Sequence, residues 1–256
     1  MKSLLEESES TISSFNKSRV IRIVALKTGR VALHLKGNKN IENDSLDLSS
    51  LPFSILFRDE AILVINKPAD LLSVPGLGCS EHSVQSLLSP LFPELRMVHR
   101  LDYATSGIML MAMNKSASQH LNFQFRERTV RKMYHATVTG KIVKEGVVEL
   151  PILQDPSNPM KNCVHRDGKA STSKFVRVNY NEESDESSVH LFPVTGRTHQ
   201  LRVHMMAVGH PMIGDPKYAP EEIRTKSSRL HLHAATLTLQ HPWSHELFTI
   251  SAPCPF

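Results

Sequence analysis

The sequence has little cysteine and no paired metal-ligand motif. Its 256 residues include three cysteines, Cys79, Cys163 and Cys254, and none belongs to a CxxC pair. Because structural zinc needs clustered ligands, and disulfides are rare in a reducing compartment, we interpret all three as ordinary thiols. The 14 histidines contain no HExxH or comparable set, and His231 and His233 in RLHLHAATL alternate as on one strand face. We therefore expect no metal.

Long apolar runs and nucleotide-binding motifs are also missing. No stretch approaches the length needed to span a bilayer. The opening segment MKSLLEESESTISS has Glu where a signal peptide needs an uninterrupted apolar stretch, so we expect a cytoplasmic protein without a membrane partner. GxxxxGK[ST] and GxGxxG do not occur, and nothing else in the sequence indicates a nucleotide cofactor.

The composition is that of an ordinary globular protein with a small net positive charge. Hydrophobic residues make up 40% and charged residues 21%, which is typical of a protein with a packed core. The net charge is +5 and the pI about 9.1. Such a charge permits an acidic partner such as nucleic acid, but does not require one.

The first 50 residues differ from the remainder in composition. Ser, Glu, Asn and Lys dominate Met1–Ser18 and Gly37–Ser50, and only Val20–Leu35 has the pattern of strands, with a turn at KTGR. We interpret residues 1–50 as an N-terminal extension, partly disordered, and residues 51–256 as one main domain.

In the main domain, strand and helix patterns are mixed. Continuous apolar or alternating runs predict strands, and a repeat at every third or fourth residue predicts helices. The strands are expected at Ala61–Asn66, at Gly107–Met113, in MYHATVTG, and in a C-terminal hairpin of LHAATLTL and ELFTISA; the helices are expected in HSVQSLL and across Ala117, Leu121 and Phe125. The regular βαβ rhythm of a doubly wound fold is missing, so the class is α+β.

The first segment with residues suited to catalysis or binding is MVHRLDYATSG. Asp102 and Arg100 lie in a short polar stretch between Val98 and the strand that starts near Gly107. A carboxylate on a loop held by a rigid strand is well placed to act on a substrate. The alternative is an aspartate that caps a turn, with the arginine as its solvated partner.

A second segment is PVTGRTHQLRVHMMAVGHPMIGD. It predicts a helix that Thr195 or Thr198 caps, with Leu201, Met205 and Val208 as its apolar stripe and a stop at the following Gly-His-Pro. Two arginines near the start of a helix oppose its dipole.

These two arginines are Arg197, at the helix entry, and Arg202, beside the apolar stripe. Either they are solvated, or they meet an anion such as a phosphate or a carboxylate.

A third segment is FRERTVRKMYHATVTG. Tyr134 shares a strand face with buried positions, so its ring is expected to point inward, where it is either a core residue or part of a site. Arg126, Arg128, Arg131 and Lys132 precede it, either as phosphate contacts or as a solvated turn.

Together the segments resemble the RluA-type pseudouridine synthases. The similarity rests on HRLD followed by TSG, a basic stretch running into KxY, then GRTHQLRVH and GHPxxGD. It also includes NKPADLLSVPG and RLHLHAATLTLQHP, in the family's order from about Ile55 to Ala252. The resemblance implies the pseudouridine synthase fold, a central, mostly antiparallel mixed sheet flanked by helices and loops, with an RNA-binding cleft.

The resemblance also implies an activity and a substrate. Uridines in RNA are isomerised to pseudouridine, and the most similar branch acts on 23S rRNA, on tRNA anticodon stem-loops, or on both. DNA is not an expected partner, and the protein is expected to be a monomer. Residues 1–50 are too short for the S4 RNA-binding domain of several relatives, so target choice is expected to depend on the catalytic domain.

By motif position the resemblance assigns roles to particular residues. Asp102 corresponds to the catalytic nucleophile, Arg202 to the arginine paired with it, and Tyr134 to the tyrosine that stacks on the target base and can assist proton removal from C5. Leu201 would line the pocket, and Arg100 would fill the space that the flipped base leaves in the RNA. Flipping is required because neither C1′ nor C5 of a stacked base is accessible.

Further contacts are assigned to the remaining basic residues. Phosphate contacts would come from Arg197, Arg126, Arg128, Arg131 and Lys132. No cofactor is expected, because substrate and product are isomers.

Two rival functions are open to test. An inactive RNA-binding protein on the same scaffold would bind RNA without turnover. A carboxylate hydrolase would need a paired acid and base, and no such pair is visible in the sequence.

Overall fold

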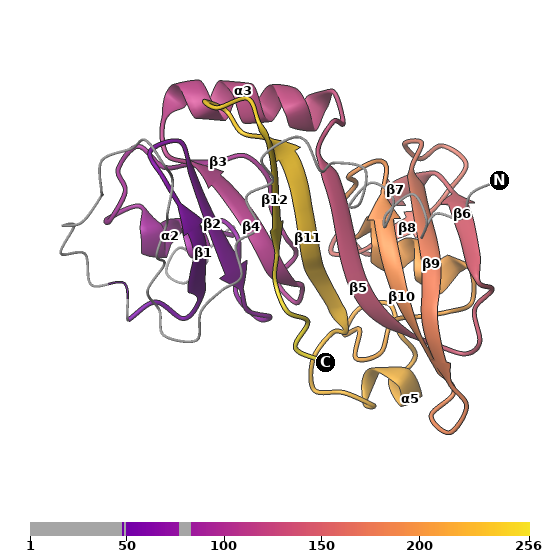
Figure 1. Cartoon of the computed structure of the whole chain (residues 1–256). Coiled ribbons are helices and arrows are strands. Elements are labelled where there is room, and N and C mark those ends of the chain that lie inside the picture. The colour runs from indigo at the N-terminus through magenta and orange to yellow at the C-terminus, as the bar shows by residue number, and fades with distance from the viewer. Residues whose placement is uncertain (1–47, 49, 77–82) are drawn as a thin grey trace.

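The centre of the molecule is a large, mostly antiparallel sheet (Figure 1). The computed structural model describes Leu48 and residues 50–76 and 83–256. The expected N-terminal extension, with its Val20–Leu35 strands, therefore lies outside the described residues, as does Cys79. Cys163 and Cys254 are free thiols.

Eight strands follow one another across the sheet, and two short strands extend it at the side. In spatial order the eight are β1 (Ser54–Arg58), β2 (Ile62–Lys67), β4 (Ser106–Ala112), β11 (Leu232–Gln240), β5 (Arg131–Thr139), β10 (Glu186–Pro193), β9 (Thr172–Asn181) and β6 (Glu145–Glu149). The added strands are β3 (Arg96–Met97), which pairs with β4, and β12 (Leu247–Ser251), which pairs with β11. A separate hairpin joins β7 (Ile152–Gln154) to β8 (Asn162–Val164).

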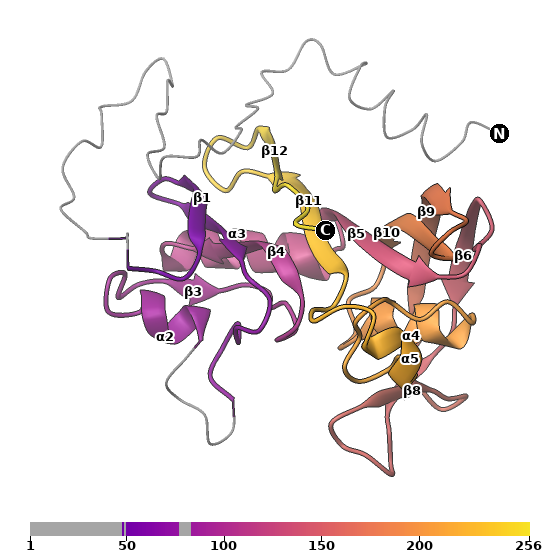
Figure 2. The ribbon, with the colours of Figure 1, turned by 90° about the horizontal axis from the view of Figure 1, so that it is seen from below.

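Short helices complete the described part of the chain. They are α2 (Val84–Leu88), α3 (Lys115–Arg126), α4 (Gln200–Ala207) and α5 (Glu221–Arg224). Helix α4 packs against β8, β9 and β10, away from α3 (Figure 2). The predicted α+β class is confirmed.

The strands and helices that the sequence predicts most strongly are present with small shifts in their limits. Every residue of β4 is buried, as its unbroken apolar run indicates. Helix α3 begins where the Asn114 side chain accepts the Ala117 N–H, and it buries Ala117 and Leu121 against the sheet. The C-terminal hairpin forms as the antiparallel pair β11–β12. The sequence therefore specifies these elements locally.

The sheet divides between β4 and β11, and the division places the site. These strands are parallel and pair only through Ser106 with His233 and Gly107 with Ala234. Beyond these two positions β3 occupies the edge of β4, and β12 occupies that of β11. Gly107 is required at the contact, since its φ is +113° and a Cβ would lie 2.3 Å from the Ala234 carbonyl oxygen. The loop that carries Asp102 ends at this point.

Candidate active site

A pocket of about 480 Å³ opens between the loop before β4, strand β5 and the start of α4. Its lining includes every residue to which the sequence analysis gave a site role except Arg131. Arg131 is exposed, and strand alternation puts it on the face of β5 opposite to Lys132 and Tyr134. We call Asp102, Tyr134, Leu201 and Arg202 the pocket floor. We call the exposed Arg100, Arg126, Arg128 and Arg197 the pocket rim.

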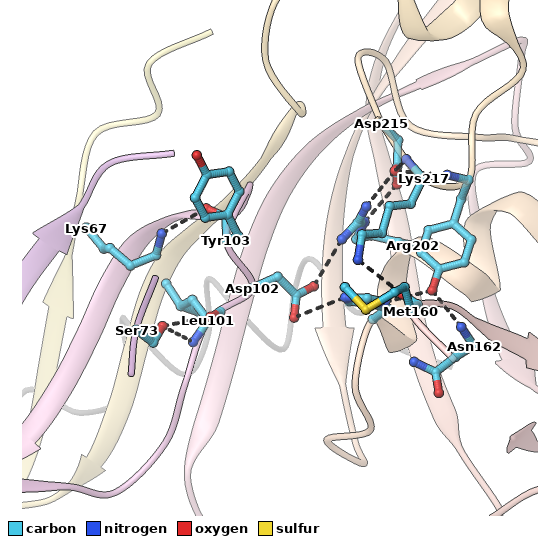
Figure 3. Close-up of polar contacts among 12 residues, drawn as sticks. Lys67, Ser73, Leu101, Asp102, Tyr103, Met160, Asn162, Arg202, Asp215 and Lys217 are labelled. Atoms are coloured by element: carbon cyan, nitrogen blue, oxygen red, sulfur yellow. Dashed lines mark hydrogen bonds and ion pairs between the residues drawn. The ribbon is translucent and has the colours of Figure 1, made fainter. Parts of the chain in front are cut away.

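The Asp102 loop is held to the rest of the protein by its neighbours on both sides. The Ser73 hydroxyl donates to the Leu101 carbonyl oxygen at 2.7 Å and accepts the Leu101 N–H at 3.0 Å. Within the loop, the Thr105 N–H donates to the Asp102 carbonyl oxygen at 3.1 Å. These bonds fix the backbone and leave the Asp102 carboxylate free to face the pocket (Figure 3).

Lys67 supports the same loop through hydrogen bonds to backbone carbonyl oxygens. Its ammonium group is fully buried and donates to the carbonyl oxygens of Pro68 and Leu71 at 2.7 Å and of Tyr103 at 3.2 Å. Burial lowers the pKa of Lys67 to about 7, and the negative charges of Asp102 and Asp70 oppose the decrease. Lys67 thus joins the end of β2 to the residue that follows Asp102.

His99 is a third support. Its Nε2 accepts the Leu110 N–H at 2.9 Å, and its ring stacks on Phe125 with centroids 5.1 Å apart. Burial, and then the charge of Lys132, lowers the pKa of His99 to about 4. The imidazole is therefore neutral at pH 7 and can accept this bond.

The start of α4 differs from the sequence prediction. Neither Thr195 nor Thr198 caps the helix; the N-cap is His199, whose φ of 57° lies in the left-handed region and whose side chain makes no capping bond. The Gln200 side chain shapes this turn instead. Its oxygen accepts from the Thr195 hydroxyl at 2.7 Å and the Arg197 N–H at 3.0 Å, and its nitrogen donates to the Thr172 carbonyl oxygen at 2.9 Å.

The predicted apolar stripe of α4 is also partly wrong. Leu201 and Met205 are buried, but Val208 is exposed because it is the C-cap residue, where the chain turns through Gly209 with φ 85°. The predicted stop at Gly209 is confirmed.

Arg202 is the central cation of the floor. Its Nη1 lies 3.5 Å from Asp102 Oδ2, which is consistent with the pairing that the sequence motif implies. Its strongest partner, however, is Asp215, through Nε to Oδ2 at 2.8 Å and Nη2 to Oδ1 at 2.6 Å (Figure 3). Both side chains are almost fully buried, with 2% and 1% exposed. A bidentate pair of this kind fixes the guanidinium plane, and with it the group that faces Asp102.

The electrostatics of this pair follow from its geometry. Burial alone would lower the pKa of Arg202, but the hydrogen bonds and the charge of Asp215 more than offset it and raise that pKa. Burial would raise the pKa of Asp215, and the bonds from Arg202 instead hold it below its usual range. Both groups therefore stay charged, and Asp102 faces a permanent cation.

Tyr134 and Leu201 form the apolar side of the floor. Tyr134 packs against the cluster that contains Leu201, Ala136 and Leu232, which confirms its inward direction. Burial, and then the charge of Asp102, raises the pKa of the Tyr134 phenol. None of the described residues hydrogen-bonds with its hydroxyl. A neutral phenol ring facing the pocket suits stacking on a base.

The rim consists of cations with few partners. Arg126 pairs with Glu127 at 3.1 Å on the surface, but no acidic side chain of residues 50–76 or 83–256 pairs with Arg100, Arg128 or Arg197. Lys132, half-buried in the wall, lies 6.0 Å from the centroid of the Phe125 ring, and burial lowers its pKa. These charges are available to an anionic ligand.

Four residues of the site were missed by the sequence analysis: Lys67, His199, Asp215 and Tyr218. Asp215 had a usable signal, because a buried arginine needs a carboxylate and the quoted GHPxxGD motif ends in one. Lys67 is the last residue of β2, a position where a lysine is normally solvated, so no local pattern indicates its burial. His199 and Tyr218 carried no signal that distinguishes them from surface residues.

Two negative findings concern the described residues only. They contain no group of three or more His, Cys, Asp or Glu arranged to hold a metal ion. None of their helices combines the length and apolar character that crossing a membrane demands.

Comparison with known proteins places the sequence among RNA-modifying enzymes. Residues 61–207 match the family model described as RNA pseudouridylate synthase. The chain is 45% identical over 208 residues to the "Dual-specificity RNA pseudouridine synthase RluA" of Vibrio parahaemolyticus, covering 79% of this chain and 83% of the relative. It is 44% identical over 206 residues to the protein of the same name in Escherichia coli K12, covering 79% and 93%.

Solved structures agree. "Human RNA Pseudouridylate Synthase Domain Containing 1" is similar with a TM-score of 0.69 and 32% identity, covering 80% of this chain and 84% of that one. "Human RNA Pseudouridylate Synthase Domain Containing 4" gives 0.64 and 26%, covering 78% and 88%.

Proposed function

The chain belongs to the RNA pseudouridylate synthase family, and from that premise we propose that it modifies uridines in both rRNA and tRNA stem-loops with Asp102 as its nucleophile. Enzymes of this family isomerise uridine to pseudouridine, and this protein is such an enzyme. The N1–C1′ bond breaks, the uracil turns, C5 bonds to C1′ and loses its proton to solvent, and N1 takes up a proton, so that the product is an isomer of the substrate. The proposal concerns which residues do this and on which RNA.

The observation that carries the proposal is the position of the Asp102 carboxylate. It lies in the pocket with 19% of its side chain exposed, 3.5 Å from the buried Arg202 and on a loop fixed by Ser73 and Lys67. A carboxylate can attack a carbon and later leave, so it suits a covalent step on C1′ or on the uracil ring. Arg202, which stays charged, places a permanent cation beside this carboxylate.

The other residues of the floor and rim have supporting roles in this proposal. Tyr134 stacks on the flipped uracil, and its raised pKa argues against action as a phenolate base. Leu201 packs beside the base. Arg100 occupies the space that the uracil vacates in the RNA, since its exposed side chain lies just before Asp102 in the same loop. Arg126, Arg128, Arg197 and the half-buried Lys132 contact phosphates.

Target choice is proposed from the relatives. Those named above carry the name "Dual-specificity", and at 44–45% identity we extend two RNA classes to this chain. Stem-loops suit the chemistry because unstacking a loop base costs less than unstacking one in a helix. We also propose that residues 51–256 are the catalytic domain, acting as a monomer in the cytoplasm. One chain supplies Asp102, Tyr134 and Arg202 to the same pocket.

Tritium release tests the proposal. Total rRNA and tRNA carrying tritium at uridine C5, prepared from cells that lack this gene, are incubated separately with wild type, Asp102→Asn and Asp102→Ala. We expect wild type to release tritium from both RNA classes and neither variant to do so. Tritium release by Asp102→Asn would contradict the role of Asp102 as the nucleophile. Release from one RNA class only would contradict dual specificity, and free uracil among the products would indicate a hydrolase.

A further inference from the structure

The His199 ring lies between Asp102 and Tyr218, where no catalytic role has been assigned to it. Its Nε2 is 3.9 Å from Asp102 Oδ1, and its Nδ1 is 2.7 Å from the Tyr218 hydroxyl. The left-handed backbone of His199 and the Gln200 side chain hold this ring in place at the start of α4. The two nitrogens therefore contact two different parts of the site.

Hydrogen bonding to Tyr218 decides which nitrogen carries the proton. The Tyr218 oxygen accepts the backbone N–H of Asn162 at 2.9 Å, and His199 Nδ1, at 2.7 Å, is placed to accept the Tyr218 proton. Burial raises the pKa of Tyr218, and bonds from Asn162 oppose the increase, so the phenol keeps its proton. A phenol that donates to Nδ1 leaves the imidazole hydrogen on Nε2.

The charges around His199 agree with a neutral ring. Burial lowers the pKa of His199 to about 4; Arg202 and Lys217 lower it further, and Asp102 and Asp215 oppose the decrease. At pH 7 the ring is a neutral imidazole with one N–H. The other tautomer would direct the Nε2 lone pair at a carboxylate, which is repulsive.

We propose that Tyr218 and His199 form a positioning relay for the nucleophile, in which the Tyr218 hydroxyl fixes His199 as the Nε2–H tautomer and that N–H orients Asp102 Oδ1. Arg202 faces the other oxygen, Oδ2, so each carboxylate oxygen has its own donor. At 3.9 Å the contact is longer than a hydrogen bond, and the relay requires it to shorten in the substrate complex. The relay rests on the proposed role of Asp102.

Tyr218 offers a clean way to test the relay. Its ring also lies against Arg202, 5.0 Å from the guanidinium carbon to the ring centroid. Tyr218→Phe keeps that ring and removes only the hydroxyl. Tyr180→Phe is the matched control, because it removes a phenol that bonds to Asp185 on the surface, outside the pocket.

Kinetics give the first readout. We expect Tyr218→Phe to lower kcat about tenfold, the size of one lost hydrogen bond, with KM for RNA within twofold of wild type. Tyr180→Phe should keep both constants. A change in KM with an unchanged kcat would overturn the relay, and so would the absence of any change.

A double variant separates the relay from mere packing. In His199→Gln the side-chain amide supplies an N–H without help from Tyr218. Tyr218→Phe should therefore cost less than twofold more in that background. An additional tenfold loss would show that Tyr218 acts independently of His199, and would contradict the relay.

Nitrogen-15 NMR of the imidazole gives a readout that does not depend on activity. Wild type at pH 7 should show His199 protonated at Nε2 and not at Nδ1, and Tyr218→Phe should show a mixture of tautomers. A wild-type Nδ1–H tautomer, or an imidazolium, would overturn the proposal. If wild type releases no tritium while His199 has the Nε2–H form, the proposed function fails and the tautomer assignment stands.

Discussion

The pocket floor and the pocket rim handle charge in opposite ways. In the floor, Arg202 is 2% exposed and has two carboxylate partners, Asp215 and Asp102. In the rim, the Arg126 side chain is 69% exposed with one surface partner, Glu127. The protein itself neutralises the charges of the floor, whereas those of the rim remain available to a ligand.

Under the proposed function, this difference separates the residues that carry out chemistry from those that bind RNA. Buried charges are held in one geometry and are little affected by salt, which suits a group that must meet a reacting atom. Exposed cations have weak, salt-dependent interactions and suit a polyanion whose position is fixed by many contacts. We therefore expect changes in the floor to alter stability and the rate constant, and changes in the rim to alter affinity.

The largest effect is expected from removal of the buried cation. Arg202→Met leaves Asp215 charged and almost fully buried, and the free energy of unfolding should fall by about 3–5 kcal/mol. Chemical denaturation measures it. In the control, Arg202→Met/Asp215→Asn, the amide oxygen can still accept the N–H groups of Lys217 and Tyr218, so most of the stability should return. A single variant within about 1 kcal/mol of wild type would mean that the floor is not internally neutralised.

A smaller effect is expected on the free energy of unfolding at acid pH, through the buried His99. The folded pKa of His99 is about 4 and its ordinary value is 6.5, so the unfolded chain binds more protons between these values. The contribution of His99 to stability is present above pH 6.5 and is lost as the pH falls toward 4. Between pH 7 and pH 5 wild type should lose about 1–2 kcal/mol more than His99→Gln, which cannot be protonated.

The comparison uses thermal or urea unfolding of both proteins at the two pH values. His199 and His233 also have pKa values lowered to about 4 by burial, but they contribute equally to both proteins. Equal losses in wild type and variant would show that His99 does not titrate in this window.

How far the sequence predicts this arrangement depends on the range of the interactions. β4 and the inward ring of Tyr134 follow from local patterns, an apolar run and a strand alternation. The cap of α4 does not, because the Gln200 side chain reaches back to Thr172, far away in the chain. β9 and β10 were not predicted either, because serines occupy some of their buried positions, among them Ser173 and Ser187, and interrupt the apolar pattern.

The candidate site shows the same division. Asp102, Tyr134 and Arg202, which the motifs single out, all line one pocket in the structure. The contacts that hold them are tertiary: no local pattern indicates the burial of Lys67, and the motif that contains Asp215 does not show that it pairs with Arg202. Arg131 was grouped with Lys132 by sequence, and the strand places the two on opposite faces.

The smallest effect is expected at the rim. Arg197→Ala should weaken RNA binding severalfold, and a plot of log affinity against log salt should become shallower by about 0.7 for a lost phosphate contact on single-stranded RNA. Fluorescence titration of a labelled stem-loop at several salt concentrations measures this slope. Arg131→Ala is the matched control on the opposite face and should leave the slope unchanged. If both variants changed the slope equally, the rim arginines would bind RNA no differently from other surface arginines.

The most direct test of the division between floor and rim is tritium release measured under single turnover, with enzyme in excess, across a titration of enzyme. Asp102→Asn should bind the stem-loop with wild-type affinity and release no tritium at any concentration. The double variant Arg128→Ala/Arg197→Ala should reach the wild-type rate constant at saturation, with its half-saturating concentration increased severalfold. Loss of affinity in Asp102→Asn, or a lowered saturating rate constant in the rim variant, would contradict the account.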